Sequence, residues 1–268
     1  MKRALFVLSV VTVTLAVPAA VMLAGGKAQP KPVLSPPQSN AFGMSLPEFA
    51  TEWWKWAWGI PAFDEDGDLL NPLFDETGEL AAVGQGDRFW FLAGTFYDVI
   101  PEAHRVVDIP PGTPLIFPIQ NGAWLHEPEN GEPPWYEPYD ADGDGEPDYD
   151  TFEDYVAEVL TWVMDELWVG DNLICTIDGV EVSAEEIAKT ALVSPTFVAD
   201  IPEGSVRELM PGADPLEPGP HYAMAMGYYL RIPPLSAGQH TIEICIMGED
   251  DILMYVTYDI TVGRAKKK

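Results

Sequence analysis

Basic residues are scarce in this chain of 268 residues, in which 14 lysines and arginines stand against 43 aspartates and glutamates, for a net charge of −29. Between Pro32 and Gly263 the basic residues are Lys55, Arg88, Arg105, Lys189, Arg207 and Arg231. Such an acidic body repels nucleic acid and anionic membrane surfaces and attracts cations, so nucleic acid is excluded as a partner. Calcium sites, adaptation to high salt and plain solubility remain as explanations of the acidity.

Motifs for zinc chemistry and for activated nucleophiles are also missing. The four histidines, His104, His126, His221 and His240, include no pair at the spacing of a zinc-binding helix. No G-x-S-x-G segment is present, and neither cysteine has a neighbouring group that would activate it. A pair of carboxylates acting as acid and base stays open, because 43 acidic residues always supply candidates.

Long hydrophobic runs are absent apart from one at the N-terminus. Lys2 and Arg3 precede the uncharged residues 4–26, an order that is typical of an export signal. Residues 1–28 are predicted to form a signal peptide or an uncleaved membrane anchor, since about 20 apolar residues span a bilayer. The proline-rich residues 29–44 predict an extended linker, and residues 264–268 form a basic tail. We expect a secreted, periplasmic or cell-surface protein that meets the membrane only through its N-terminal segment.

Cysteine is limited to Cys175 and Cys245. In the oxidising compartment that export implies, such a pair commonly forms one disulfide, and the sequence predicts that bond. The alternative is two buried free thiols, because a disulfide requires the two segments to lie side by side.

Tryptophan, by contrast, is concentrated in WWKWAW at residues 53–58, which hold four of the nine in the chain. Ser45 and Glu48 match a capping box, and Gly59 with Pro61 supplies a stop, so the segment is predicted to be helical. The polar residues of this helix fall on one arc, which indicates that the opposite face packs against the body.

Helical spacing separates the four tryptophans. Trp53 lies at the centre of the apolar face, with Trp56 on one shoulder and with Trp54 and Trp58 on the other. We expect Trp53 to be part of the core and Trp56 to be largely buried. The cluster is mostly an anchor, and Trp54 and Trp58 are the two whose position on the helix would allow contact with a ligand.

The rest of the chain is predicted to be mainly β. The strand candidates are residues 88–95, 114–119, 194–198, 221–232, 240–247 and 252–262. Asp178-Gly179 predicts a hairpin tip within residues 172–182, and residues 151–168 predict a second amphipathic helix. The order of elements predicts one β-sandwich domain over residues 45–263, jelly-roll or immunoglobulin-like, with two flanking amphipathic helices.

The acidic stretch DADGDGEPDYD at residues 140–150 carries the clearest motif for a site. Acidic residues occupy positions 1, 3, 5 and 9 of a calcium loop, and glycine occupies position 6. Position 12 departs from the pattern, because Thr151 stands where a bidentate glutamate is expected. The predicted ligands of a Ca²⁺ ion are Asp140, Asp142, Asp144, Asp148 and Asp150, and the alternative is a solvated acidic loop.

A second acidic cluster lies at Asp64, Asp66 and Asp68. It copies the first three positions of the calcium loop but has Leu69 where glycine is needed. A polar turn therefore explains this cluster better than a metal site.

Aromatic residues crowd the long loop beside the acidic stretch. Exposed aromatic side chains next to a calcium-ordered loop suit contact with carbohydrate or another polymer. The candidates for such contact are Trp124, Trp135, Tyr136 and Tyr139. The alternative is that these side chains clamp the long loop onto the body.

Several short segments carry a resemblance to a known family. They are WWKW at 53–56, NPL at 71–73, Gly84-Gln85, WFLAGT at 90–95, residues 110–119, Ser194-Pro195 and PLSAGQHTI at 234–242. In these segments the chain resembles an uncharacterised family of exported bacterial proteins, over residues 45–262. Relatives often carry cysteines near the positions of Leu80 and Val107, where this chain has apolar residues. The resemblance implies an exported single domain and carries no activity or site residues with it.

These features predict an exported, acidic, calcium-stabilised β-sandwich without catalytic activity that binds a carbohydrate polymer or an envelope protein. The alternative is an extracellular hydrolase, which requires two facing carboxylates in a cleft, one of them with a raised pKa. A purely structural component of the cell envelope is a third hypothesis.

Overall fold

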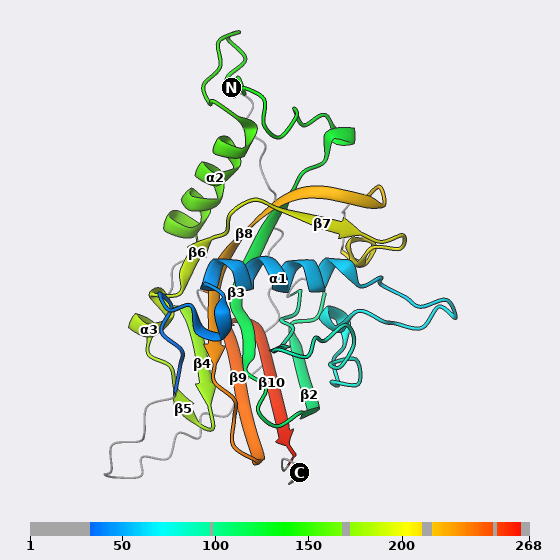
Figure 1. Ribbon diagram of the computed structural model, residues 1–268, viewed down its shortest axis with the longest axis vertical. Helices are drawn as coiled ribbons and strands as arrows, with labels where there is room; N and C mark the ends of the chain where they lie inside the picture. The colour runs from blue at the N-terminus through cyan, green and yellow to red at the C-terminus, as the bar shows by residue number, and fades with distance from the viewer. Residues whose placement is uncertain (1–32, 97–98, 168–171, 211–215, 249–250, 264–268) are drawn as a thin grey trace.

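Two five-stranded β-sheets form the body of the computed structural model (Figure 1). The structure describes residues 33–96, 99–167, 172–210, 216–248 and 251–263. The predicted export segment at residues 1–28 and the basic tail at residues 264–268 lie outside the described residues. The mainly β sandwich expected from the sequence is confirmed.

The first sheet is built around two long antiparallel strands. They are β3 (Leu115–Leu125) and β8 (Gly219–Ile232). The short strand β1 (Trp90–Phe91) runs parallel to β3. On its other edge β8 pairs in turn with β6 (Ala191–Val193) and β7 (Phe197–Ile201). Because β1 covers only the start of β3, the later half of β3 has one strand partner among the described residues.

The second sheet has the order β2-β10-β9-β4-β5. Its strands are β2 (Glu102–Ile109), β10 (Ile252–Val262), β9 (Gly238–Met247), β4 (Leu173–Ile177) and β5 (Val180–Glu181). The strands β9 and β10 form an antiparallel pair, whereas β2 runs parallel to β10. Buried residues of both sheets and of the helices belong to one hydrophobic cluster.

The helices start where local capping chemistry predicts. The first, α1 (Leu46–Gly59), begins with a complete capping box of Ser45 and Glu48, and the short α3 (Ala184–Ala188) begins with another of Ser183 and Glu186. Thr151 caps α2 (Phe152–Trp162), which continues as a π-helical turn at Val163–Leu167. Short 3-10 helices lie at Ala41–Gly43, Pro72–Phe74, Pro128–Asn130 and Val206–Leu209.

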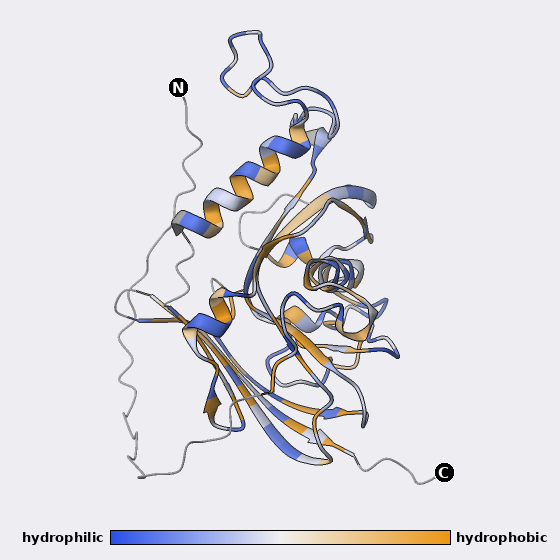
Figure 2. Ribbon diagram, turned by 60° about the vertical axis from the view of Figure 1, so that its left-hand side comes forward, coloured by the Kyte–Doolittle hydropathy of each residue, from blue (hydrophilic) through white to orange (hydrophobic). Residues whose placement is uncertain are grey.

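The helix α2 is amphipathic, and Figure 2 shows hydrophilic and hydrophobic residues alternating along it. Phe152, Val156 and Leu160 face the body at helical spacing. Trp162 is 53% exposed at the end of the helix. None of the described helices is long and apolar enough to cross a membrane.

The four clustered tryptophans of α1 are all buried. Trp53 is 2% exposed and Trp56 is 8% exposed, as the helical pattern predicts. The expectation that Trp54 and Trp58 reach a ligand from the surface is wrong, because they are 6% and 7% exposed. The Trp54 indole donates a hydrogen bond to the Tyr229 hydroxyl at 2.9 Å. Packing therefore covers both shoulders of α1, and a helical pattern cannot predict a second covering layer.

The strand β2 is absent from the predicted strands because its buried face contains a charge. Its residues alternate between exposed and buried along the whole strand. Arg105 is 1% exposed, whereas the neighbouring Val106 is 63% exposed. This reversal removes the alternation of apolar and polar residues by which a half-buried strand is recognised.

The two cysteines are free thiols, so the predicted disulfide between Cys175 and Cys245 is wrong. Their strands, β4 and β9, are neighbours, but Cys175 lies opposite Ile244 and Cys245 lies opposite Ile174. This offset of one residue directs the two side chains to opposite faces of the sheet. Burial raises the pKa of Cys175 to about 12, which makes this thiol unreactive.

The described part of the predicted linker is held on the body. The buried Arg231 guanidinium donates to the carbonyl oxygens of Pro36 at 2.9 Å and Ser39 at 2.8 Å, and to that of Met44 at 3.1 Å. The Ser35 N–H donates to the Arg231 carbonyl at 2.9 Å. From Ser35 onward the predicted linker therefore packs on the body, because a basic residue distant in sequence binds its carbonyl groups.

The hairpin predicted at Asp178-Gly179 is confirmed. Ile177 pairs with Val180, and both turn residues have positive φ, +53° at Asp178 and +72° at Gly179. The Asp178 carboxylate accepts hydrogen bonds from the Thr241 N–H at 3.0 Å and from the His240 ring at 2.8 Å. This turn therefore ties β9 to the hairpin.

The contact between Asp178 and His240 predicts a pH-dependent contribution to stability. Burial lowers the pKa of His240, but the hydrogen bond to Asp178, the hydrogen bond to Ser236 and the Asp178 charge together raise it above its ordinary value. Because the folded pKa is raised, the contribution is complete below the unfolded pKa of 6.5 and is lost as the pH rises through the folded pKa. For this partly exposed pair the loss should be about 0.5 kcal/mol.

The variant Asp178→Asn tests this expectation, since asparagine suits a turn with positive φ, removes the charge and keeps one of the two accepting oxygens. Urea denaturation from pH 5 to pH 9 should show the wild type losing more stability than the variant above about pH 6.5. Parallel pH profiles of the two proteins would contradict it. His104→Ala serves as control, because His104 is a more exposed histidine that contacts a different acid, Asp259.

Candidate metal centre

The acidic loop forms a closed, hairpin-like turn just before α2, and it lies at the N-terminal end of that helix in Figure 1. Tyr139 and Tyr149 form a β-bridge at its base, with N–H groups donating to carbonyl oxygens at 3.1 Å in both directions. The Phe152 N–H donates to the Glu137 carbonyl at 2.9 Å, next to the Thr151 cap. The two ends of the loop are thus fixed to each other and to the start of α2.

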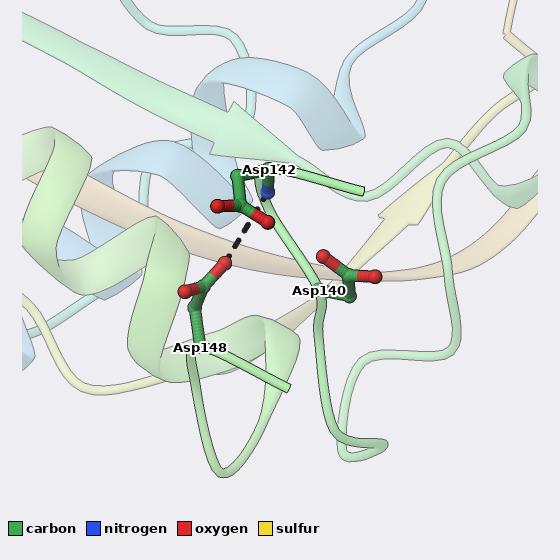
Figure 3. Close-up of side chains that lie close together, drawn as sticks. All are labelled: Asp140, Asp142 and Asp148. Carbon is green, nitrogen blue, oxygen red and sulfur yellow. Dashed lines mark hydrogen bonds between the residues drawn. The ribbon is translucent and has the colours of Figure 1, made fainter. Parts of the chain in front are cut away.

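Three carboxylates converge inside this loop. Asp140, Asp142 and Asp148 each offer an oxygen atom, and these oxygens lie within 4.8 Å of one another (Figure 3). One Asp148 oxygen also accepts hydrogen bonds from the N–H groups of Ala141 at 2.9 Å and Asp142 at 3.2 Å. This cluster can hold a metal ion, and it comes from positions 1, 3 and 9 of the sequence motif.

The Asp140 carboxylate organises the turn around itself. It accepts hydrogen bonds from the N–H groups of Gly143 at 2.6 Å, Asp144 at 3.2 Å and Gly145 at 2.7 Å. The bond from Gly145 is the largest of the influences that hold the pKa of Asp140 below its ordinary value. Gly143 and Gly145 have φ of +79° and +97°, so glycine allows the chain to wrap around this carboxylate. Asp140 is therefore ionised at neutral pH.

Two of the five predicted ligands lie outside the cluster. Asp144 accepts the Glu146 N–H at 2.9 Å, and neither Asp144 nor Asp150 belongs to the group of converging oxygens. The other acidic stretch forms a polar turn, in which Asp64 accepts the N–H groups of Asp66 and Asp68, both at 2.9 Å. The described residues thus bring three acids together in the first loop, and no such group includes the second stretch.

Beneath the loop lies an aromatic layer built on the first turn of α2. Phe152 and Tyr155 are stacked at 5.6 Å between ring centroids, and Tyr139 packs on both, at 5.0 Å and 4.8 Å. Trp124 contacts the same two rings, at 6.0 Å and 6.3 Å. Movement of the acidic loop is therefore coupled through Tyr139 to this layer.

The four aromatic residues predicted to contact a ligand differ in exposure. Trp135 is 2% exposed and its indole donates to Thr196, so contact of Trp135 with a ligand is a wrong expectation. Trp124 and Tyr139 are partly buried and pack against the hydrophobic core, which fits the alternative that these side chains clamp the long loop onto the body. Tyr136, by contrast, is 52% exposed.

Sequence reasoning missed one exposed partner, Tyr222 of β8. It is 38% exposed, packs edge-on against Tyr136 at 5.2 Å and stacks on Trp135 at 6.0 Å. Val198 of β7 lies opposite Tyr222 and is 43% exposed. The alternation of buried and exposed residues at the start of β8 could have predicted that Tyr222 is exposed, because His221 and Ala223 on either side of it point inward. We call Tyr136, Tyr222 and Val198 the tyrosine surface.

Acidic and histidine side chains next to the aromatic layer form hydrogen bonds or ion pairs with neighbouring residues. Burial raises the pKa of Glu132, against the opposing effect of hydrogen bonds from the Glu127 N–H and the Trp124 indole. Glu127 forms an ion pair with Arg207. The buried His126 and His221 rings contact carbonyl oxygens, of Pro133 at 2.8 Å and of His126 and Glu217 at 2.9 Å and 2.8 Å. These contacts position the long loop, and the nearby Glu127 charge is a further cause of the raised pKa of Glu132.

Comparison with known proteins finds no matching family model, no matching curated protein and no matching solved structure. The resemblance to exported bacterial proteins stays a prediction. The acidic loop and the surfaces near it carry the chemistry on which the proposed function is based.

Proposed function

We propose that this protein is an exported, calcium-stabilised β-sandwich without catalytic activity, and that it binds a polymer or a protein at the cell envelope. The observation that carries the proposal is the convergence of Asp140, Asp142 and Asp148 in a loop with the spacing of a calcium site. Ca²⁺ takes six to eight oxygen ligands, and three carboxylates with nearby carbonyl oxygens and water supply such a shell.

The geometry supports calcium over zinc because the converging ligands are all carboxylate oxygens. It favours calcium over magnesium because the loop follows the spacing of calcium loops, whereas magnesium keeps most of its water shell. Binding would neutralise part of the repulsion among the three aspartates. It would also hold Tyr139 and hence the aromatic layer in place.

Calcium is expected to raise the melting temperature of the protein. A ligand at 100 times its Kd stabilises a folded protein by about 2.7 kcal/mol, which corresponds to roughly 5–10 °C for a chain of this size. Thermal melting followed by circular dichroism, in EDTA and over a calcium series, measures the effect. Magnesium at the same concentrations should give a smaller rise.

A matched pair of variants locates the effect. Asp140→Asn with Asp142→Asn should abolish the calcium-dependent rise, whereas Asp64→Asn with Asp66→Asn removes the same charge from the other acidic turn and should leave it intact. The absence of a rise in the wild type, or an equal rise in both double variants, would remove calcium from the proposed function.

The tyrosine surface is the proposed contact for the polymer or protein. Two partly exposed rings backed by the buried Trp135 offer a rigid apolar platform with hydroxyl groups at its edge, which suits stacking on sugar rings. Tyr136→Ala with Tyr222→Ala should abolish pull-down by envelope polysaccharide or peptidoglycan. Tyr255→Ala is the control, a tyrosine on the other sheet that bonds to Glu243. Equal retention of both variants would contradict the assignment.

The alternative function, an extracellular hydrolase, has one observation in its favour. Glu132 has a raised pKa and lies beside Trp124 at the edge of the aromatic layer, as a general acid would. Release of soluble sugars from envelope polysaccharide, lost in Glu132→Gln, would establish this alternative and replace the non-catalytic proposal.

A further inference from the structure

A cavity lies away from the acidic loop, between the two sheets and beside α1. It has a volume of about 250 Å³. Its walls include Trp53 and Trp54 of α1, residues 118–121 of β3, Ile246 of β9 and Met254 of β10. The acidic loop projects beyond α2, whereas α1 crosses the middle of the view in Figure 1. The cavity is therefore separate from the candidate metal centre and from the tyrosine surface.

A distortion of β3 creates one wall of this cavity. The register of β3 against β8 shifts between Pro118 and Gln120, and Ile119 has no partner on β8. In a regular strand successive side chains point to opposite faces, yet four consecutive residues of β3 line the cavity here. Such a bulge redirects side chains and is common beside binding sites.

Gly227 of β8 makes this distortion feasible. It lies opposite Asn121, and a Cβ atom added to it would be 2.4 Å from the Gln120 carbonyl oxygen and 2.8 Å from the Asn121 Cα. Only glycine allows the bulged strand to approach so closely. The bulge, the proline and the glycine thus combine to present Gln120 and Asn121 to the cavity.

Hydrogen bonds orient the polar group in this wall. The Asn121 amide donates to the hydroxyl of Tyr229 at 3.2 Å, and the Trp54 indole donates to the same hydroxyl at 2.9 Å. Tyr229 is fully buried. The Asn121 side chain is therefore held in one orientation, with its carbonyl oxygen available to a donor. Among the described residues, the Gln120 side chain has no hydrogen-bond partner, and the same holds for the shielded hydroxyl of Thr95 in the wall.

The other side chains that line the cavity are apolar or uncharged. None of the described lining residues carries a charge, although the chain has 43 acidic residues. Tryptophan faces and methionine sulfur favour a flat ring. A sugar would bury several hydroxyl groups without partners, and an ion would lose its hydration without a counter-charge. An empty cavity of about 150 Å³ already accepts benzene, so this one has room for a somewhat larger ring system.

We infer that this cavity binds a small uncharged ring compound that carries one or two hydrogen-bonding groups, with its ring against Trp53, Trp54 and Met254 and its donor on the Asn121 carbonyl oxygen. This site does not depend on calcium or on the tyrosine surface. It gives the protein a small-molecule ligand in addition to its proposed envelope partner.

The probe is 5-fluoroindole, a neutral bicyclic ring with one N–H donor, followed by fluorine NMR on the full exported chain. Its resonance should broaden and shift saturably, and excess indole should reverse the change. Indole-3-carboxylate, which has the same ring with a charge, should compete at least tenfold more weakly, since about 1.4 kcal/mol corresponds to a factor of ten. No saturable change, or equal competition by the carboxylate, would overturn the inference.

Substitutions in the wall and outside it localise the binding. Asn121→Leu should weaken it about tenfold, the value of one hydrogen bond to a buried polar group, whereas Asn130→Leu on an exposed loop should leave it unchanged. Met254→Trp should narrow the cavity and weaken binding. Should that variant fail to fold by circular dichroism, Val99→Trp at the exposed rim serves the same purpose. Unchanged binding in Asn121→Leu and in the folded blocking variant would place the ligand elsewhere and overturn the inference.

Discussion

Replacement of Arg105 by alanine is expected to lower the free energy of unfolding by about 4 kcal/mol or more. The guanidinium group is buried and donates to four oxygens on three segments of the chain. It reaches the carbonyl oxygens of Asp75 and Ala93, both at 2.6 Å, that of Gly94 at 3.1 Å, and the Tyr258 hydroxyl at 2.5 Å. Removing it leaves the carbonyl oxygens of Asp75 and Gly94 without this donor and opens a void beside the Tyr258 ring. The Ala93 carbonyl oxygen keeps one donor, the Tyr258 hydroxyl at 2.7 Å, and each unmet buried acceptor costs about 1–3 kcal/mol.

Urea denaturation of three variants separates the contributions. Arg105→Met restores most of the volume but none of the donors, so it should remain destabilised by more than about 2 kcal/mol. Val106→Ala changes the next residue of β2, which is 63% exposed, and should stay within about 0.5 kcal/mol of the wild type. If Arg105→Met is as stable as the wild type, the hydrogen bonds of Arg105 do not hold these segments together.

Replacement of Gly227 by alanine is expected to cost about 3 kcal/mol and to loosen the pairing of β3 with β8. Two effects combine at this residue. Its φ of +144° disfavours any side chain, and the new Cβ would lie 2.4 Å from the Gln120 carbonyl oxygen. Because the obstacle is backbone, it cannot be relieved by rotating a side chain.

A glycine on the same strand separates the two effects. Gly219 has a φ of +130° but nothing within 4 Å of an added Cβ. Gly219→Ala should therefore show only the conformational cost, about 1 kcal/mol. Hydrogen exchange of the β3 and β8 amides should increase in Gly227→Ala and stay unchanged in Gly219→Ala. Equal stability of the two variants would refute the close approach of the strands as the cause.

Elements whose determinants are local were predicted correctly. The capping box of Ser45 and Glu48 marks the start of α1, and Asp178-Gly179 marks the hairpin tip, because the interacting groups lie within four residues of each other. The acidic loop belongs to the same class in part. Its spacing brings Asp140, Asp142 and Asp148 together, as expected for a turn that hydrogen-bonds to its own carboxylates.

Features that depend on distant partners were predicted less well. Arg105 is buried because carbonyl groups from residues 75, 93 and 94 surround it, and no local pattern announces such a partner. Trp54 is covered because Tyr229 lies against it, 175 residues away in the chain. The register of β4 against β9 separates the cysteines, and a shift of one residue would have reversed that result.

The sequence by itself determined that this protein is mainly β, where its capped helices begin and which loop gathers carboxylates, because hydrophobic period, caps and turn residues act over a few neighbours. Only the tertiary structure decided which aromatic rings are exposed, that the two cysteines lie on opposite faces of their sheet and where a cavity opens. Those properties follow from strand register and from packing between segments far apart in sequence. The bulge in β3 illustrates the difference, because Gly227 of the distant strand β8 leaves the room that Gln120 and Asn121 need to line the cavity.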